Sequence, residues 1–313
     1  MLDEVVEAFR DNVEKQPKNG IVFLDCTLGG GGHAYKLAQW IGNNGLYIGI
    51  DQDREAIENA SKRLNTLSKD EKPKLELVQD NFSNIDDVLS SIPVDGLDGV
   101  LMDLGVSSYQ IDNTDRGFSF KQNCILDMRM NPQSEISALD VVNTYSEYDL
   151  SNLIYKYSDE IYAKKIASNI VKSRKTQAIK TSDQLVEIIK NSIPARARRH
   201  GGHPAKRTFQ ALRIEVNDEI KKLNDALDQI IKWLNTGGVI AIISYHSLED
   251  RIVKSKFKSC VNRCACPKTL PKCVCGRKPI FNIITNKPIM AKDSEVKENR
   301  RSRSAKLRVA KRI

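Results

Sequence analysis

The segment Ile21–His33, IVFLDCTLGGGGH, decides the fold. Its apolar run Ile21–Leu24 ends at the carboxylate Asp25 and leads within a few residues into four glycines, after which a helical pattern begins at His33. A buried strand that feeds a glycine-rich turn at a helix N-terminus has this pattern. Glycines permit positive φ angles and let a ligand approach the main chain, while the first N–H groups of the helix face the same space. The segment therefore predicts a cradle for a small molecule.

A second expected strand, Leu46–Ile50, ends at the carboxylate Asp51. An acid about 20 residues beyond a glycine turn is placed to accept the two hydroxyls of a ribose, so the cradle is expected to hold a nucleoside. The glycine spacing is a weak signal by itself, because Gly29, Gly31 and Ala34 also fit the dinucleotide pattern. A turn without a ligand and a nicotinamide-dependent dehydrogenase are the alternatives.

Strand and helix patterns alternate through the first hundred residues, which predicts an α/β fold with a doubly wound parallel sheet. The carboxyl ends of parallel strands meet at one edge, so the glycine turn, Asp51 and Asp103 should lie together where open α/β sheets bind ligands. The other expected elements are helices at Met1–Asn12, Ala34–Ile41, Arg54–Leu67 and Ile85–Leu89 and strands at Leu75–Val78 and Leu97–Leu104.

Residues 107–206 show a different pattern. Apolar residues three and four apart predict helices at Tyr145–Lys172 and Ser182–Ile193, and no strong strand is evident. An inserted helical domain of roughly a hundred residues, a common domain size, is the simplest account.

The sheet pattern resumes after an expected long helix, Arg207–Leu234, with a strand at Gly238–Ser244 and a further helix opened by YHSLEDRIVK. Two short segments near the C-terminus, Ile280–Ile284 and Ala305–Val309, are expected to form a closing pair of strands. We therefore expect a discontinuous domain, 1–106 and 207–313, with the helical domain inserted.

The net charge of +9 and the pI near 9.1 favour a polyanionic partner. Two segments concentrate the charge: Pro194–Arg213 has six basic residues and no acid, and Lys297–Ile313 has eight basic residues and one acid. Both are candidate nucleic-acid patches, with Phe209 offering a face for a nucleobase; solvated charge is the alternative. No apolar run approaches the roughly 20 residues of a membrane span, and no signal peptide is evident, so a cytoplasmic protein is expected.

Four of the seven cysteines lie close together, and a chain of this size without a secretory signal favours reduced thiols. Cys264-x-Cys266 and Cys273-x-Cys275 could hold a tetrahedral zinc ion, but zinc pairs usually leave two or more residues between the cysteines. Structural zinc and a loop of reduced thiols both stay open, and no metal is assigned.

Two further segments place chemistry at the expected sheet edge. DLGVSSYQIDNTDRGFSF combines Asp103 at a strand end with the amide Gln110, and SYHSLED places Tyr245 and His246 after the next strand. Polar groups beside a nucleoside site are more often functional than not. His246 could act as a base, but a histidine at a helix start also caps or orients a loop, so we assign it a positioning role.

With these motifs in view, the chain closely resembles the bacterial ribosomal RNA small-subunit methyltransferase H family, also called MraW. The motifs occur in the family's order and span nearly the whole chain: LDCTLGGGGH, GIDQD, DLGVSSYQID with RGFSF and LDMRM, HPAKRTFQALRIEVNDE, ISYHSLEDRIVK and RSAKLRVAKR. The resemblance implies a class I S-adenosylmethionine-dependent methyltransferase fold with an inserted helical, RNA-recognition domain. It also implies methylation of the exocyclic amino group of a cytidine in the decoding region of small-subunit ribosomal RNA.

The resemblance further implies roles for individual residues. Asp51 would bind the ribose, Phe82 the adenine, and Asp103 and Gln110 the methionine end. Our own hypothesis from the residues is that Asp103 or nearby backbone carbonyls orient the cytosine amino group, and that Tyr245 and His246 help to shape the pocket. The remaining cofactor contacts would come from Gly31, Gly32 and His33. The implied partner is small-subunit ribosomal RNA or the small ribosomal subunit, and a homodimer stays open.

The sequence departs from the family's pattern at three places. Family members usually have residues before the position of Met1, so we expect a piece of the site's edge to be missing from this sequence. Tyr109 replaces a common proline, and Asn123-Cys124 replaces an acidic-glycine pair, which changes the expected local loop geometry. A DNA amino-methyltransferase lacks support because no D-P-P-Y motif is present, whereas a non-catalytic RNA-binding protein would leave the nucleoside pocket without a role.

Overall fold

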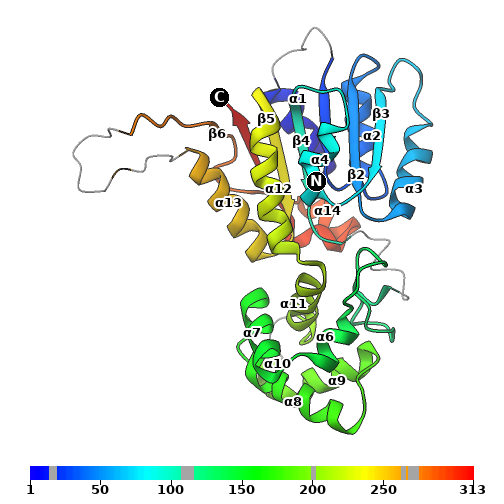
Figure 1. Ribbon diagram of the computed structural model, residues 1–313, viewed down its shortest axis with the longest axis vertical. Helices are drawn as coiled ribbons and strands as arrows, with labels where there is room; N and C mark the ends of the chain where they lie inside the picture. The colour runs from blue at the N-terminus through cyan, green and yellow to red at the C-terminus, as the bar shows by residue number, and fades with distance from the viewer. Residues whose placement is uncertain (14–19, 107–115, 199–201, 262–265, 267–274) are drawn as a thin grey trace. The chain divides into compact units, whose positions relative to one another are not determined.

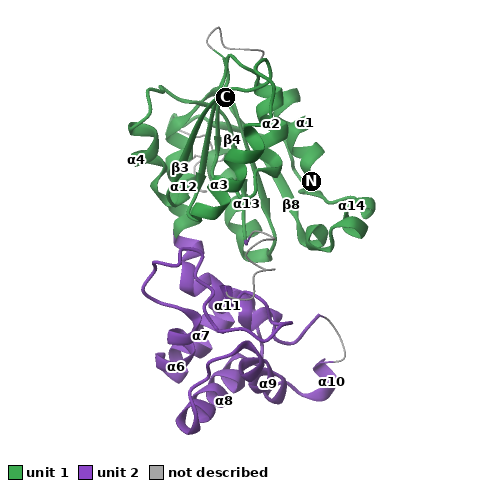
Figure 2. Ribbon diagram, turned by 90° about the vertical axis from the view of Figure 1, so that its right-hand side faces the viewer, with its two compact units in different colours: residues 1–105, 222–313 green, residues 106–221 purple. Residues whose placement is uncertain are grey.

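A computed structural model of the chain describes residues 1–13, 20–106, 116–198, 202–261, 266 and 275–313. The chain forms two compact units, coloured separately in Figure 2: the sheet unit (residues 1–105 and 222–313) and the helical unit (residues 106–221). The second boundary therefore lies at 221/222 and not at the expected 206/207. The physical reason is that helix α11 (Lys206–Asn217) buries Phe209, Ala211 and Leu212 in the core of the helical unit.

The sheet unit contains one mostly parallel sheet. Its strands follow the order β3-β2-β1-β4-β5-β8-β6, in which β3 to β5 are parallel, β8 runs antiparallel to β5 and β6, and β7 pairs with β8. The expected doubly wound α/β sheet is confirmed, as is the closing pair of strands. The strands are β1 (Val22–Asp25), β2 (Leu46–Asp51), β3 (Lys74–Gln79), β4 (Leu97–Asp103), β5 (Leu234–Ser244), β6 (Phe281–Ile283), β7 (Ile289–Met290) and β8 (Lys306–Arg312).

Helices cover both faces of this sheet, which gives three layers (Figure 1). Successive side chains of a strand point to opposite faces, so Phe23 packs with the helices on one side and Leu24 with those on the other. One face is covered by α1 (Leu2–Asn12), α2 (Gly32–Ile41) and α3 (Arg54–Leu64), and the other by α4 (Ile85–Ser90), α12 (Glu219–Trp233) and α13 (Ser247–Val261). The short elements η1 (Phe82–Asn84), α14 (Asp293–Glu298) and η3 (Arg300–Ser304) complete the unit.

The helical unit packs around a separate hydrophobic core. Between its described residues, the one strand-like pairing is the single bridge from Ile125 to Thr181. Besides α11, the helices in the described part of this unit are α6 (Ala138–Thr144), α7 (Glu147–Ser158), α8 (Ala163–Thr176), α9 (Ser182–Ser192) and α10 (Ala195–Arg198).

Two helices expected to be continuous are each divided in two. Asp159 ends α7 with φ 52°, so the expected helix Tyr145–Lys172 becomes α7 and α8. Asp218 ends α11 with φ 49°, so the expected helix Arg207–Leu234 becomes α11 and α12. Aspartate tolerates the left-handed conformation that stops a helix better than most residues do, and the apolar periodicity continues across both breaks. In the described part of the chain, no helix is long and apolar enough to cross a membrane.

Candidate active site

The glycine turn between β1 and α2 forms the cradle that the sequence predicts. Gly29 and Gly31 have φ angles of 50° and 73°, and Gly31 is the N-cap of α2. A Cβ atom on Gly31 would lie 3.0 Å from the Cα of Ala60, so the turn fits closely against α3. A Cβ on Gly30 or Gly32 would meet no atom within 4 Å. One side of the turn therefore packs on the protein, and the other side faces open space beside the helix N-terminus.

Asp51, at the end of β2, ties this turn to the neighbouring loop. Its carboxylate accepts hydrogen bonds from the N–H groups of Gly29 at 2.8 Å and Asp53 at 2.9 Å. Burial raises the pKa of Asp51. A carboxylate has about four acceptor positions, so these bonds leave capacity for the hydroxyls of a ribose.

Asp103, His33 and Tyr245 lie close together although they come from three different parts of the sheet unit. Asp103 ends β4, His33 lies in the first turn of α2, and Tyr245 follows β5. The carboxylate of Asp103 accepts a hydrogen bond from the Tyr245 hydroxyl at 2.8 Å, and its other oxygen lies 3.5 Å from Nδ1 of His33. Burial raises the pKa of Asp103, against the opposing effects of His33 and of the hydrogen bond from Tyr245. Burial and the Asp103 carboxylate also raise the pKa of Tyr245. Nε2 of His33 is buried and has no hydrogen-bond partner among the described residues.

A chain of partly buried hydrogen bonds that sequence reasoning missed connects Asp103 to Thr27, Asp25 and Tyr47. Thr27 Oγ1 accepts a hydrogen bond from the backbone N–H of Asp103 at 2.6 Å, and the Thr27 N–H donates to Asp25 at 3.0 Å. The Tyr47 hydroxyl donates to the same carboxylate at 2.6 Å. Burial raises the pKa of Asp25 to about 6. The sequence could have indicated the contact between Thr27 and Asp25, because an acid stands two residues before a threonine at the end of a strand. The contact between Tyr47 and Asp25 could not be read from the sequence, because it depends on the pairing of β1 with β2.

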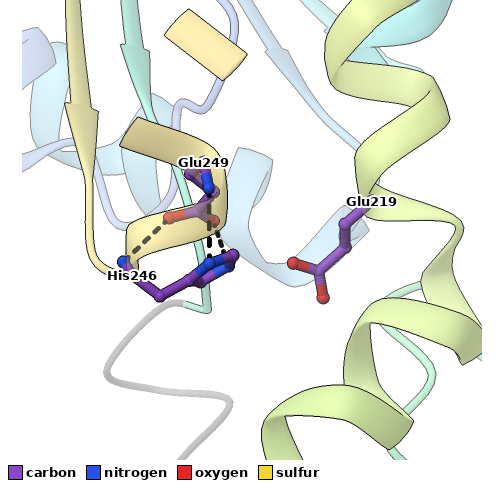
Figure 3. A group of neighbouring side chains, drawn as sticks. All are labelled: Glu219, His246 and Glu249. Atoms are coloured by element: carbon purple, nitrogen blue, oxygen red, sulfur yellow. Dashed lines mark hydrogen bonds and ion pairs between the residues drawn. The ribbon is translucent and has the colours of Figure 1, made fainter. Parts of the chain in front are cut away.

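His246 occupies the N-cap position of α13, where it exchanges hydrogen bonds with Glu249 (Figure 3). The Glu249 carboxylate accepts the N–H groups of Tyr245 at 2.8 Å and His246 at 3.3 Å, and the Glu249 N–H donates to Nδ1 of His246 at 3.4 Å. This arrangement is a capping box with histidine in place of serine or threonine. Glu219, also drawn in Figure 3, belongs to the helical unit, where it forms a bidentate pair with Arg213 at 2.7 and 2.8 Å.

The remaining expected site residues divide into one described residue and several that are not described. Phe82 begins η1 directly after β3 and its loop, is half-buried, and packs against the core. Gln110, Cys264 and Cys273 lie outside the described residues, so the contact of Gln110 with the methionine end and the four-cysteine group stay predictions.

The basic segments differ from expectation in how their side chains are used. The prediction that Phe209 stacks on a nucleobase is wrong, because the residue is 4% exposed and its ring packs edge-on against Phe120. In the C-terminal segment, Arg308 forms a bidentate pair with Asp250, and Arg312 donates to the Leu234 carbonyl at 2.7 Å. These two arginines hold β8 in place, so fewer basic side chains are left for a nucleic acid than the charge count indicates.

Comparisons with known proteins agree with the motifs of the sequence. A model of the MraW methylase family matches residues 1–313. Ribosomal RNA small subunit methyltransferase H of Lachnospira eligens is 46% identical over 100% of this chain and 96% of its own length, and that of Halothermothrix orenii is 49% identical over 96% and 94%. A putative rRNA-methylase structure from Clostridium thermocellum aligns with a TM-score of 0.46 and 14% identity, over 100% of this chain and 97% of the other.

The mostly parallel sheet with helices on both faces is the α/β fold of class I methyltransferases. The family match covers the whole chain, and relatives at 46% and 49% identity cover nearly all of it. The chain belongs to the MraW methylase family.

Proposed function

We propose that the protein transfers the methyl group of S-adenosylmethionine to the exocyclic amino group of a cytidine in the decoding region of small-subunit ribosomal RNA. Membership of the MraW methylase family and the names of the relatives support methylation of small-subunit ribosomal RNA. The observation that carries the proposal is that the Asp103 carboxylate contacts both the Tyr245 hydroxyl and the His33 ring beside the glycine turn.

The residues of the cradle fit the proposed cofactor. The open side of Gly30 and Gly32 lets a ligand approach the main chain, and Nε2 of His33, which has no hydrogen-bond partner among the described residues, offers a polar contact there. Asp51 would accept the ribose hydroxyls, and Phe82 would pack against the adenine. S-adenosylmethionine would supply an electrophilic methyl group on a sulfonium, with Gly31, Gly32, His33 and Gln110 completing the contacts.

The proposed acceptor explains why a carboxylate stands at this strand end. The amino nitrogen of cytosine is a poor nucleophile because its lone pair is delocalised into the ring, so the enzyme must hold it in line with the methyl group. Asp103 would accept a hydrogen bond from the amino group, and Tyr245 fixes the carboxylate for this task. His246 acts through its cap, which holds the backbone N–H of Tyr245 on the Glu249 carboxylate. The target base would leave its stack before reaction, which suits a loop of RNA.

The decisive experiment measures transfer of labelled methyl groups from S-adenosylmethionine to small ribosomal subunits that lack this modification. Free small-subunit RNA and duplex DNA serve as parallel acceptors. We expect label in one cytidine of the RNA, at its exocyclic nitrogen, as determined by digestion and mass spectrometry. Label on DNA would favour a DNA methyltransferase, and cofactor binding without transfer to any acceptor would favour a non-catalytic RNA-binding protein.

Three further expectations from the sequence stay predictions: the RNA-recognition role of the helical unit, the cytoplasmic location and a homodimer.

A further inference from the structure

Helix α8 carries a concentration of positive charge that none of the features above uses. Its fourteen residues, AKKIASNIVKSRKT, contain five basic residues and no acid. The acid-free stretch is longer than the helix, since it fills the sequence between Glu160 and Asp183 and also includes Lys180. This stretch does not overlap Pro194–Arg213 or the C-terminal segment.

Four of these residues form one exposed face of α8, the lysine face (Lys164, Lys165, Lys172 and Lys175). At 3.6 residues per turn they fall within an arc of about 100°. The opposite side of the helix buries Ile166, Ala167 and Ile170 in the core of the helical unit. The orientation of the lysine face is therefore fixed by the packing of the helix.

Among the described residues, the lysine face lacks the acidic partners that other basic residues of the unit have. None of its four lysines forms an ion pair with any residue in the described ranges. By contrast, Lys190 pairs with Glu187 at 2.7 Å, and Arg207 lies 3.7 Å from Glu160. Arg174 of the same helix serves the fold, because its guanidinium donates to the carbonyls of Val142 at 2.8 Å and Tyr145 at 2.6 Å.

Unpaired like charges on one helix face repel one another, and a polyanion removes that repulsion. Lys164 and Lys175 are eleven residues apart, a rise of about 16 Å along the axis, which is enough for several phosphates of one strand. Lysine binds phosphate as a point charge and reads no base edge, so such a surface fits a backbone of any sequence.

We propose that the lysine face of α8 binds the phosphate backbone of the substrate RNA and supplies sequence-independent affinity. This inference rests on the proposed function, since it assumes an RNA substrate. It assigns positioning of the RNA strand to α8, and it leaves the choice of the methylated base to other residues.

A charge-matched pair of variants tests the proposal. In the test variant, Lys164, Lys165, Lys172 and Lys175 are each replaced by Gln. In the control variant, four exposed lysines of the sheet unit that form no ion pair with the described residues are each replaced by Gln: Lys62, Lys69, Lys254 and Lys258. Circular dichroism confirms that both variants are folded.

The measurements are KM and kcat for methyl transfer to small ribosomal subunits, RNA affinity against salt concentration, and binding of S-adenosylmethionine. For the test variant we expect the slope of log affinity against log salt to shrink by about 0.7 to 0.9 for each phosphate contact removed. KM for the subunit should rise by at least about ten-fold. Binding of S-adenosylmethionine and kcat at saturating subunit should stay unchanged.

Equal salt slopes for the test variant and the wild type would overturn the proposal, as would equal losses in the test and control variants. A wild-type protein that transfers no methyl group would count against the proposed function. An active wild type whose test variant keeps its KM and salt slope would count against the lysine face alone.

Discussion

The sheet edge of the sheet unit and the lysine face of the helical unit use polar side chains in opposite ways. At the sheet edge, Asp25, Asp51 and Asp103 are largely buried, accept defined hydrogen bonds and have raised pKa values. On α8, the lysines are exposed and form no ion pairs with the described residues. A site for a small molecule gains from fixed groups, whereas a surface for a flexible polymer gains from free charge. Changes at the sheet edge should therefore affect stability and chemistry together, and changes on α8 should affect RNA affinity alone.

The largest effect is expected for Asp103→Ala. The variant loses the proposed acceptor for the cytosine amino group and leaves the Tyr245 hydroxyl without its Asp103 partner, so turnover should fall by at least about a thousand-fold. Single-turnover methyl transfer measures the loss at saturating cofactor and RNA. Asp103→Asn serves as the matched variant because it keeps the shape of the side chain. Near-normal turnover of Asp103→Ala would remove Asp103 from the proposed role.

The pH dependence of stability should report on Asp25. Its pKa is raised from 3.8 to about 6, so between these values the folded state holds a proton that the unfolded state releases. The contribution of Asp25 to stability therefore falls as pH rises through this window, by about 3 kcal/mol in total.

Denaturant unfolding from pH 4 to pH 7 measures this decline. Asp25→Asn has no charge to bury, so its stability should depend less on pH than that of the wild type. The part of the decline caused by Asp51 and Asp103 should persist in the variant. Identical pH dependence in the two proteins would show that Asp25 does not titrate in this range.

Thr27 allows a finer test of whether its hydrogen bonds position Asp103. Thr27→Val keeps the shape but removes the acceptor for the Asp103 N–H, at a cost of about 1 to 3 kcal/mol in stability. Thr27→Ser keeps the hydroxyl. We expect Val to lower kcat about ten-fold with little change in KM for RNA, and Ser to restore most of it. Equal kcat values for the two variants would show that the hydroxyl does not position Asp103.

The smallest effect is expected at the cap of α13. His246→Ala removes the acceptor for the Glu249 N–H and should lower the free energy of unfolding by about 1 kcal/mol, whereas His246→Ser keeps an N-cap oxygen and should lose less. Thermal unfolding separates the two variants. If His246→Ser keeps the stability of the wild type but abolishes turnover, then His246 has a chemical role beyond the cap.

Much of the sheet unit could be predicted because its information is local. Runs such as Leu46–Ile50 are apolar enough for strands buried on both faces, and the acids that follow them mark the sheet edge. The cap at His246 was readable from the spacing of His246 and Glu249 in SYHSLED.

Other features depend on contacts distant in sequence. The Tyr47 hydroxyl reaches Asp25 because β1 and β2 pair in register, with Phe23 opposite Tyr47. Phe209 is buried because Phe120, almost ninety residues earlier, packs against it. The helical conformation of the backbone stops at Asp159 and Asp218, whereas the apolar periodicity of the sequence continues past both residues. The side-chain pattern therefore does not reveal these helix ends.

The close approach of Gly31 to Ala60 allows Ala60, which has no chemical role, to affect the space available to the ligand. Ala60 is fully buried in α3, and it acts as a spacer that sets how closely the glycine turn approaches that helix. A larger side chain at position 60 would push the turn outward without altering any group that binds or reacts. Helix α3 therefore helps to set the dimensions of the cradle. A substitution at the buried position 60 would change the affinity for the cofactor although this residue does not touch it.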